Sequence, residues 1–247
     1  VAEKLDIPWV VTILQPLAFL SAYEPSVLPV LPAIFQLPGL RMIAQRGIKP
    51  LSKLVTKAWA EPIHQLRQEI GLPPLKGNPL VDDQYSQGLV LAMFSPVLAK
   101  PQPDWPPDTI LTGFTFYDGS EAGSKGNRQL SSELEKFLNA GEPPIEVTLG
   151  SAAVVSPGQF YEESIKAVCR LNRRAVLLIG KNVPQADLPN NIITANYAPY
   201  SQLFSRACAI VHQGGIGTTA QALRAGRPTM VTPYSVDQPD NAARVER

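Results

Sequence analysis

The sequence predicts an α/β protein of two units, each built on a parallel β-sheet. Short, continuous apolar runs recur along the chain, as in strands that are covered on both faces. From residue 145 onward these runs alternate with helical patterns. Residues 118–143 are rich in Gly, Ser and charge, which is typical of a linker. We therefore expect a first domain over 1–118, a linker over 119–143 and a second domain over 144–247.

In the first domain, residues 9–14 (WVVTIL), 89–94 (LVLAMF) and 109–113 (TILTG) are predicted to be strands. The Pro-rich stretch 16–50 is expected to be irregular. Residues 51–70 keep apolar side chains at helical spacing and end at a Gly-Leu-Pro-Pro sequence, which predicts a helix there.

The second domain is predicted to follow a short helix near 130–139 and then to alternate between strands and helices. The expected strands are 145–149, 175–180, 192–195, 208–212 and 229–233, and the expected helices are 159–171, 200–206 and 218–225. Such alternation with short turns implies a parallel sheet with helices on both faces. Ligands of such sheets bind outside the carboxyl ends of the strands.

The composition excludes several classes of protein. With 45% hydrophobic residues the chain can bury a core, so disorder is not expected. The formal net charge is +1 and no basic run occurs, which argues against nucleic acid as a partner. Two cysteines and two histidines are too few for a disulfide framework or a His-rich metal site, and a cytoplasmic location is expected. The apolar run 9–20 is interrupted and too short to span a bilayer.

The two ends of the sequence suggest a piece of a longer protein. The chain opens on VAEKLDIPWV, which is typical of a helix end running into a strand. It stops at NAARVER, inside a predicted helix and without a Gly or Pro stop signal. We expect a fragment that is cut at both sides.

The most informative segment begins at the strand that ends in His212. Gly214, Gly215 and Gly217 follow at once, and they let the backbone turn tightly and approach a ligand closely. Thr218 then opens a helix whose first N–H groups have no partner inside the helix. Such a helix start attracts an anion, most often a phosphate. The imidazole could donate a hydrogen bond to a diphosphate or offset the charge that develops there.

Other polar and aromatic residues follow neighbouring strands and return to the same edge. Asp237 and Gln238 suit sugar hydroxyls, because a carboxylate accepts while an amide donates and accepts. Ser151 could donate to a phosphate oxygen, with a plain turn as the alternative. Tyr197 could stack on a base or pack in the core, and Asn241 could join the acid-amide pair or cap a helix. A phosphate cradle beside an acid-amide pair suggests a nucleotide joined to a polyhydroxylated group.

These segments resemble the donor-binding half of nucleotide-sugar-dependent glycosyltransferases with the two-domain GT-B fold. They are most similar to the bacterial UDP-glycosyltransferase-like group of glycosyltransferase family one, which includes antibiotic and sterol glucosyltransferases. The matching segments are TGFTFYD at 112–118, VTLGS at 147–151, YAPYSQLF at 197–204, VHQGGIGTT at 211–219 and GRPTMVTPYSVDQPDNAARV at 226–245. Residues 1–110 resemble the later part of the acceptor-binding domain more loosely. The resemblance implies two Rossmann-like domains, the first incomplete and the second truncated.

The resemblance also implies a role for individual residues. The diphosphate would be held by Ser151, His212, Gly214, Gly215, Gly217 and Thr218. Asp237 and Gln238 would bind the transferred sugar, and Tyr197 and Ala198 would flank the base. Plant relatives have Trp and Gln where this chain has Tyr197 and Tyr200, and a ribose-binding Glu near Ala220. These departures leave uracil and thymine both open as the base.

The implied reaction is an inverting transfer of a hexose from a UDP- or dTDP-sugar to a hydroxyl of an apolar small-molecule or lipid acceptor. No metal or other cofactor is expected, because helix-start amides and the histidine would offset the leaving charge. The family's catalytic base lies in an early loop, so it is expected upstream of Val1, and this piece alone is expected to be inactive. Peripheral membrane contact of the full-length protein is left open. The alternatives are a nucleotide-sugar epimerase or hydrolase on the same fold, and a non-catalytic nucleotide-sugar-binding module.

Overall fold

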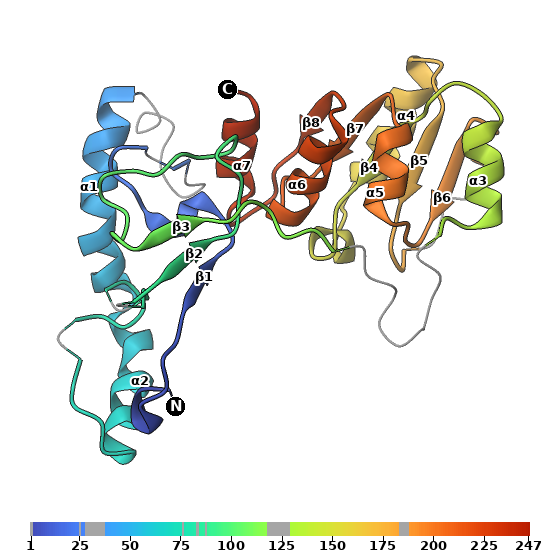
Figure 1. The fold of residues 1–247 in the computed structure, drawn as a ribbon. Helices are drawn as coiled ribbons and strands as arrows, with labels where there is room; N and C mark the ends of the chain where they lie inside the picture. The colour runs from blue at the N-terminus through green and yellow to red at the C-terminus, as the bar shows by residue number, and fades with distance from the viewer. Residues whose placement is uncertain are drawn as a thin grey trace. The chain divides into compact units, whose positions relative to one another are not determined.

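The computed structural model describes residues 2–24, 26–27, 38–75, 77–82, 84–86, 88–117, 129–182 and 188–247. These residues form two compact units, Val1–Thr115 and Phe116–Arg247 (Figure 1). Residues 118–128, which hold the predicted end of the first domain and the start of the predicted linker, lie outside the described residues. In the described part of the chain, no helix has both the length and the apolar character that crossing a membrane requires.

The first unit contains a three-stranded parallel sheet in the order β1-β2-β3. Its strands are β1 (Val11–Ile13), β2 (Val90–Ala92) and β3 (Thr109–Leu111), each inside a predicted strand. Burial of residues 9–14 on both faces was expected, and this is wrong. Trp9, Val10 and Leu14 are exposed, because β1 is an edge strand within the described residues and pairs only with β2. The core instead gathers around Phe19, whose ring stacks on that of Trp105 with centroids 4.1 Å apart.

Two helices lie between β1 and β2 in the sequence, α1 (Pro38–Val55) and α2 (Lys57–Glu69). The predicted helix over 51–70 therefore breaks at Thr56, and the prediction of irregular structure is wrong for residues 38–50. The reason is local composition. Residues 39–49 contain no proline, and most of them favour a helix, namely Leu40, Arg41, Met42, Ala44, Gln45, Arg46 and Lys49. Pro38 occupies the first helical position, where its missing N–H costs nothing.

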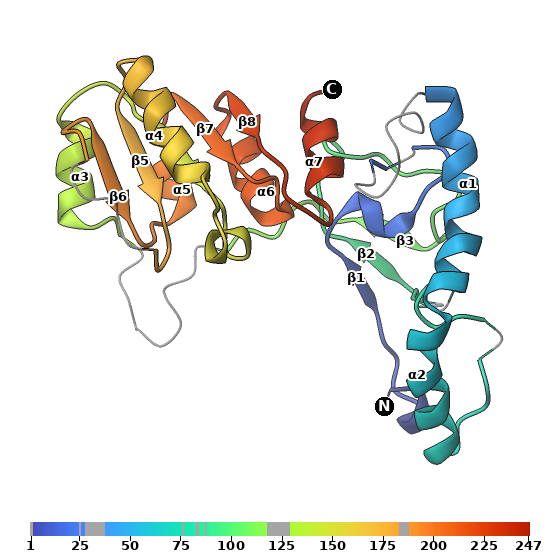
Figure 2. The same cartoon turned by 180° about the vertical axis from the view of Figure 1, so that it is seen from behind.

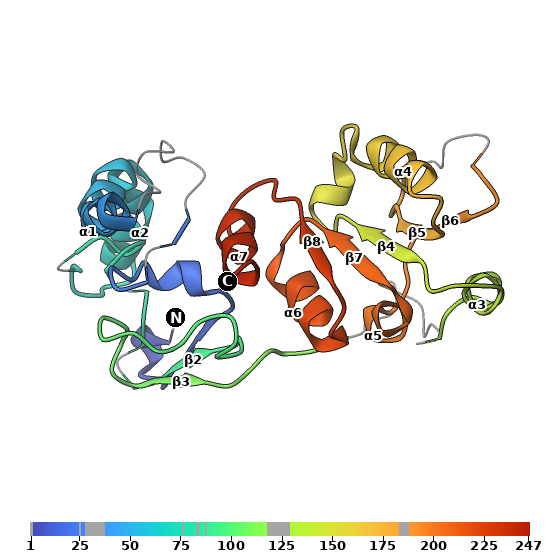
Figure 3. The same cartoon turned by 90° about the horizontal axis from the view of Figure 1, so that it is seen from above.

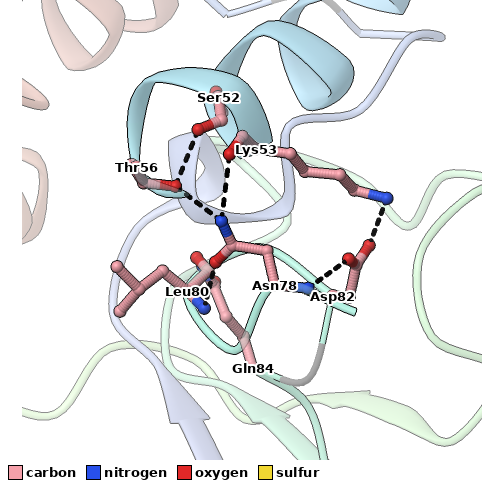
Figure 4. A network of polar contacts seen from close by, with 7 residues as sticks. All are labelled: Ser52, Lys53, Thr56, Asn78, Leu80, Asp82 and Gln84. Atoms are coloured by element: carbon pink, nitrogen blue, oxygen red, sulfur yellow. Dashed lines mark hydrogen bonds and ion pairs between the residues drawn. The ribbon is translucent and has the colours of Figure 1, made fainter. Parts of the chain in front are cut away.

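Asn78 ties the end of α1 to the loop that follows α2 (Figure 4). Its Nδ2 donates to the carbonyl of Lys53 at 3.2 Å and to Thr56 Oγ1 at 2.9 Å. Its Oδ1 accepts from the N–H of Leu80, while Asp82 accepts from the N–H of Asn78 and pairs with Lys53 at 2.6 Å. The Lys53 ammonium, which donates to Asp82, is the main cause that lowers the pKa of that carboxyl.

The second unit contains a five-stranded sheet in the order β6-β5-β4-β7-β8, and all neighbours are parallel (Figure 2). The strands are β4 (Ile145–Thr148), β5 (Ala175–Leu178), β6 (Ile192–Ala195), β7 (Ala209–His212) and β8 (Thr229–Val231). Each lies within a predicted strand. The order places β4 next to β7, although two strands separate them in the sequence.

Helices cover both faces of this sheet, as the alternation predicts (Figure 3). On one face, α4 (Phe160–Arg170) packs through Val168 against Val147 and Leu177. The other face is covered by α3 (Ser132–Asn139), α5 (Tyr200–Leu203), the 3₁₀ turn η5 (Phe204–Arg206) and α6 (Ile216–Ala225). The last helix is α7 (Gln238–Val245). Leu134 and Leu138 of α3 belong to the core, so these residues of the predicted linker are part of the second unit.

One residue of the central strand departs from the apolar pattern. Glu146 is fully buried on β4, and its cross-strand partners are the core residues Val176 and Ile210. Neither of its carboxyl oxygens has a hydrogen-bond partner in the described structure. Burial raises the pKa of Glu146 well above its usual value, so folding favours the protonated acid.

We predict that Glu146→Gln becomes more stable relative to the wild type as the pH rises from 4 to 8. The unfolded chain releases this proton above its ordinary pKa while the folded chain retains it, so wild-type stability falls with rising pH. The fall is at most about 1.4 kcal/mol per pH unit until the raised pKa is passed. Urea unfolding at pH 4, 6 and 8 measures the difference, with the exposed Glu162→Gln as control. Parallel pH profiles for the wild type and Glu146→Gln would contradict the prediction.

Candidate functional site

The sequence-predicted site residues gather at the carboxyl edge of the second sheet. Thr148 is paired with His212, and His212 with Val231, so β4, β7 and β8 end at the same level. Gly150 and Ser151 follow β4, and Tyr197 follows β6 at the edge of the sheet. Because β4 and β7 are neighbours whose following helices lie on opposite faces, a crevice is expected between their ends.

The start of α6 supplies unpaired backbone N–H groups at this crevice. Gly215 is the N-cap, and the first intrahelical bond runs from the N–H of Thr219 to the carbonyl of Gly215 at 2.9 Å. The N–H groups of residues 216–218 therefore have no partner inside the helix, and no side chain caps it. The helix begins two residues before the predicted position. A Cβ at Gly217 would meet nothing within 4 Å, so the first turn has free space beside it.

His212 lies where the sequence predicts it, but its ring is fully buried. Nδ1 accepts a hydrogen bond from the N–H of Gly214 at 2.9 Å, so the proton of the neutral ring is on Nε2. Nε2 is buried and without a partner in the described structure. Burial lowers the pKa of His212 to about 4, so the imidazole is uncharged at neutral pH. The ring supports the glycine turn through this bond, and its contact with a diphosphate stays a prediction.

Gly214 is required by packing rather than by close approach of a ligand. Its φ of 90° is in the left-handed region, and a Cβ there would lie 2.6 Å from Val231 Cγ1. Its carbonyl accepts from Asn241 Nδ2 at 2.9 Å, and the same Nδ2 donates to Asp237 Oδ2 at 2.7 Å. Asn241, which the sequence left open, is fully buried and links the glycine turn to the acid-amide pair.

Asp237 and Gln238 lie at the start of α7 with one polar group each left available. The Oε1 of Gln238 accepts from the N–H groups of Tyr234 and Ser235, at 2.7 and 3.0 Å. Its Nε2 has no partner among the described residues. Asp237 is partly exposed and uses one carboxylate oxygen for Asn241. The pair therefore presents one acceptor and one donor side by side.

A buried hydroxyl network forms the floor beneath the crevice. Thr148 Oγ1 lies 3.1 Å from the Tyr200 hydroxyl and accepts from the N–H of Gly150 at 3.2 Å. Tyr200 also hydrogen-bonds Thr218, and its ring stacks on Phe204 with centroids 4.4 Å apart. The Thr218 side chain is thus buried in the floor, and only its N–H belongs to the helix start. The role of Thr218 in holding a diphosphate stays a prediction.

The predicted base-binding residues differ in exposure. Tyr197 is 44% exposed at the end of β6, whereas Ala198 is 2% exposed and packs in the core. The Ala198 side chain therefore cannot flank a base, and only its backbone remains near the edge. Ser151 is exposed directly after Gly150, just beyond the end of β4.

The first unit contains a separate cavity of about 640 Å³, lined in part by Trp9, Ile63 and Tyr85. Trp9 precedes β1, and Gly88 of the lining precedes β2, so the cavity lies toward the amino ends of these strands. Ligands of parallel sheets bind at the opposite ends. None of its lining residues comes from the stretch 16–50.

Comparison with known proteins identifies glycosyltransferases as relatives of this chain. Residues 162–247 match the family model "Erythromycin biosynthesis protein CIII-like, C-terminal domain". The chain is 39% identical over 186 residues to the O-mycaminosyltylonolide 6-deoxyallosyltransferase of Streptomyces fradiae, covering 75% of this chain and 42% of the relative. It is 33% identical over 155 residues to a sterol 3-beta-glucosyltransferase of Arabidopsis thaliana, covering 62% and 24%.

The fold is shared with a solved glycosyltransferase structure. The solved structure of glycosyltransferase VinC in complex with DTDP superposes with a TM-score of 0.59 at 18% identity, covering 99% of this chain and 53% of that one. The chain is homologous to the family-one-like glycosyltransferases. Its sheets are those of the GT-B fold, and it spans about half or less of the length of these glycosyltransferases.

Two residues at this glycosyltransferase-like site were missed from the sequence. Gln213 was passed over because it stands between residues with stronger signals, and it is 5% exposed beside the helix start. Tyr200 was considered only as a departure from plant relatives, and its position in the floor depends on α5, a separate helix. The alternation of the β7 strand could have flagged His212 as buried, since it shares a face with the core residue Ile210.

We predict that Asn241→Ala destabilises the chain by about 2–3 kcal/mol, because it removes two buried hydrogen bonds and leaves the Gly214 carbonyl unpaired. Urea unfolding at pH 7 measures the change. The exposed Asn190→Ala is the matched control and should stay within about 0.5 kcal/mol of the wild type. Equal effects of the two substitutions would show that Asn241 does not link the turn to α7.

We also predict an acid sensitivity that depends on His212. Its folded pKa of about 4 lies below the usual 6.5, so its contribution to stability is fully present above pH 6.5 and is lost as the pH falls toward 4. The loss amounts to roughly 3 kcal/mol over this window. His212→Gln should flatten this part of the stability profile, whereas His64→Gln should retain it. A profile for His212→Gln as steep as that of the wild type would refute the assignment.

Proposed function

We propose that the protein to which this chain belongs transfers a hexose, with inversion, from a UDP- or dTDP-sugar to a hydroxyl of an apolar acceptor. One observation carries the proposal: the order of the candidate residues along the sheet edge. Tyr197 lies at β6, Ser151 and the α6 start lie at β4 and β7, and Asp237 with Gln238 follows β8. This is the order of base, diphosphate and sugar in an extended nucleotide sugar. The edge from β6 to β8 measures about 19 Å at the usual strand spacing.

The centre of the edge suits a diphosphate. The N–H groups of residues 216–218 and the positive end of the α6 dipole favour a group with two or more negative charges. The Ser151 hydroxyl on the opposite side of the crevice adds a donor. These donors are oriented before a ligand arrives, so they can stabilise the charge that develops on a leaving diphosphate. The proposed reaction therefore needs no metal ion.

The end of the edge suits a sugar. A vicinal pair of hydroxyls can donate to the available oxygen of Asp237 and accept from Nε2 of Gln238. Because the Asn241 amide and the loop N–H groups hold the other polar atoms of this pair, little ordering is required when the sugar binds.

The relatives support the class of donor and acceptor. VinC was solved with DTDP, and the Arabidopsis relative is named for a sterol, an apolar molecule with a hydroxyl group. The half-exposed ring of Tyr197 offers a stacking surface to either uracil or thymine. We leave the catalytic base unassigned among residues 1–247.

We predict that Asp237→Asn weakens binding of the nucleotide sugar about tenfold and that of the nucleoside diphosphate less than twofold. The substitution removes the charge that strengthens a hydrogen bond to a sugar hydroxyl, while the α6 start is untouched. Calorimetric titration with UDP, dTDP and their glucose conjugates measures both effects on the 247-residue chain. Equal weakening of both ligand types would exclude the pair from the sugar site. Failure of the wild type to bind any of the four would contradict the proposed function.

A further inference from the structure

The amide of Gln213 occupies a distinctive position at the candidate site. It lies between the turn that follows β4 and the turn that opens α6. A Cβ built on Gly150 would be 2.2 Å from Gln213 Nε2, and one on Gly215 would be 2.8 Å from the same atom. Nε2 is also 3.5 Å from Thr218 Oγ1. Both flanking positions are glycines, and any side chain there would have to displace this amide.

The polar atoms of this amide are not satisfied by the protein. Oε1 is buried and has no hydrogen-bond partner in the described structure. Nε2 carries two hydrogens, and its contact with Thr218 is at the upper limit for a hydrogen bond. A buried amide whose polar atoms lack hydrogen-bond partners destabilises the folded chain, unless a bound ligand supplies those partners. The side chain is 5% exposed, so a partner must come from within the crevice.

The neighbouring groups restrict what that partner can be. The N–H groups of residues 216–218 require acceptors, and the nearby Ser151 hydroxyl is able to donate to one. Oε1 of Gln213, in contrast, requires a donor. The ionised diphosphate of a nucleotide sugar supplies acceptors only, whereas the sugar beside it supplies hydroxyl groups that can donate.

We propose that Gln213 binds the donor at the junction of diphosphate and sugar, with Nε2 donating to a phosphate oxygen and Oε1 accepting from a sugar hydroxyl. This inference rests on the proposed function and adds a residue to its site. Gln213 directly precedes the Gly214 turn, which is itself bonded through Asn241 to Asp237. It is therefore placed to distinguish a nucleotide sugar from a nucleotide that lacks the sugar.

The test compares the ligand affinities of two variants. Gln213→Met keeps the side-chain volume and loses both polar groups. Gln213→Glu keeps the acceptor and adds a negative charge. UDP and dTDP are titrated by calorimetry, and the tighter one is compared with its glucose conjugate. Gln213→Met should weaken the diphosphate about tenfold and the nucleotide sugar by a further threefold or more. Gln213→Glu should weaken the diphosphate at least as much, because the carboxylate repels it. The control is Gln129→Met, at an exposed position before α3.

Thermal unfolding without ligand verifies that each variant is folded, and either variant alone can decide the outcome. Wild-type affinity of a folded Gln213 variant for both ligands overturns the inference. In that case the Asp237→Asn result still judges the proposed function separately. Equal weakening of the two ligands by Gln213→Met overturns the contact with the sugar. If the wild type binds neither nucleotide, the inference and the proposed function fail together.

Discussion

The parallel pairing of β4 with β7 is the constraint on which the rest of the second unit depends. It brings the end of a strand at residue 148 next to the end of another at 212, and the helices that follow leave on opposite faces. The crevice between them is where backbone N–H groups can face a ligand without competition from the chain itself. The glycine turn, the hydroxyl floor and the acid-amide pair are all built against these two strand ends.

The glycine turn is held by hydrogen bonds between uncharged groups. His212 is uncharged, Gly214 bonds to its ring, and Asn241 joins that turn to α7. Glu146 lies two residues before Thr148 on β4. Its burial favours the protonated acid, just as burial of His212 favours the uncharged imidazole. Burial lowers the pKa of His212 and raises that of Glu146. The folded chain therefore loses stability at low pH through the histidine and at higher pH through the glutamic acid.

The strands of the second unit were predictable because parallel strands buried on both faces leave compact apolar runs, and residues 192–195 match the observed strand at both ends. The common edge of Ser151, Asp237 and the glycine turn followed from the parallel direction of the predicted strands. The direction in which individual side chains point did not follow from the sequence. Whether Thr218 faces a ligand or Tyr200 depends on how α5 packs against α6, which no local pattern records. In the same way, Ala198 follows a strand like its neighbour Tyr197, but its side chain packs in the core.

The single amide of Asn241 has a mechanical consequence. It holds the carbonyl of Gly214 and the carboxylate of Asp237 at once, from the first turns of α7. A sideways shift of that helix must either break the contact with Gly214 or pull the glycine turn with it. A contact that displaces α7 from outside the crevice therefore also displaces the glycine turn inside it.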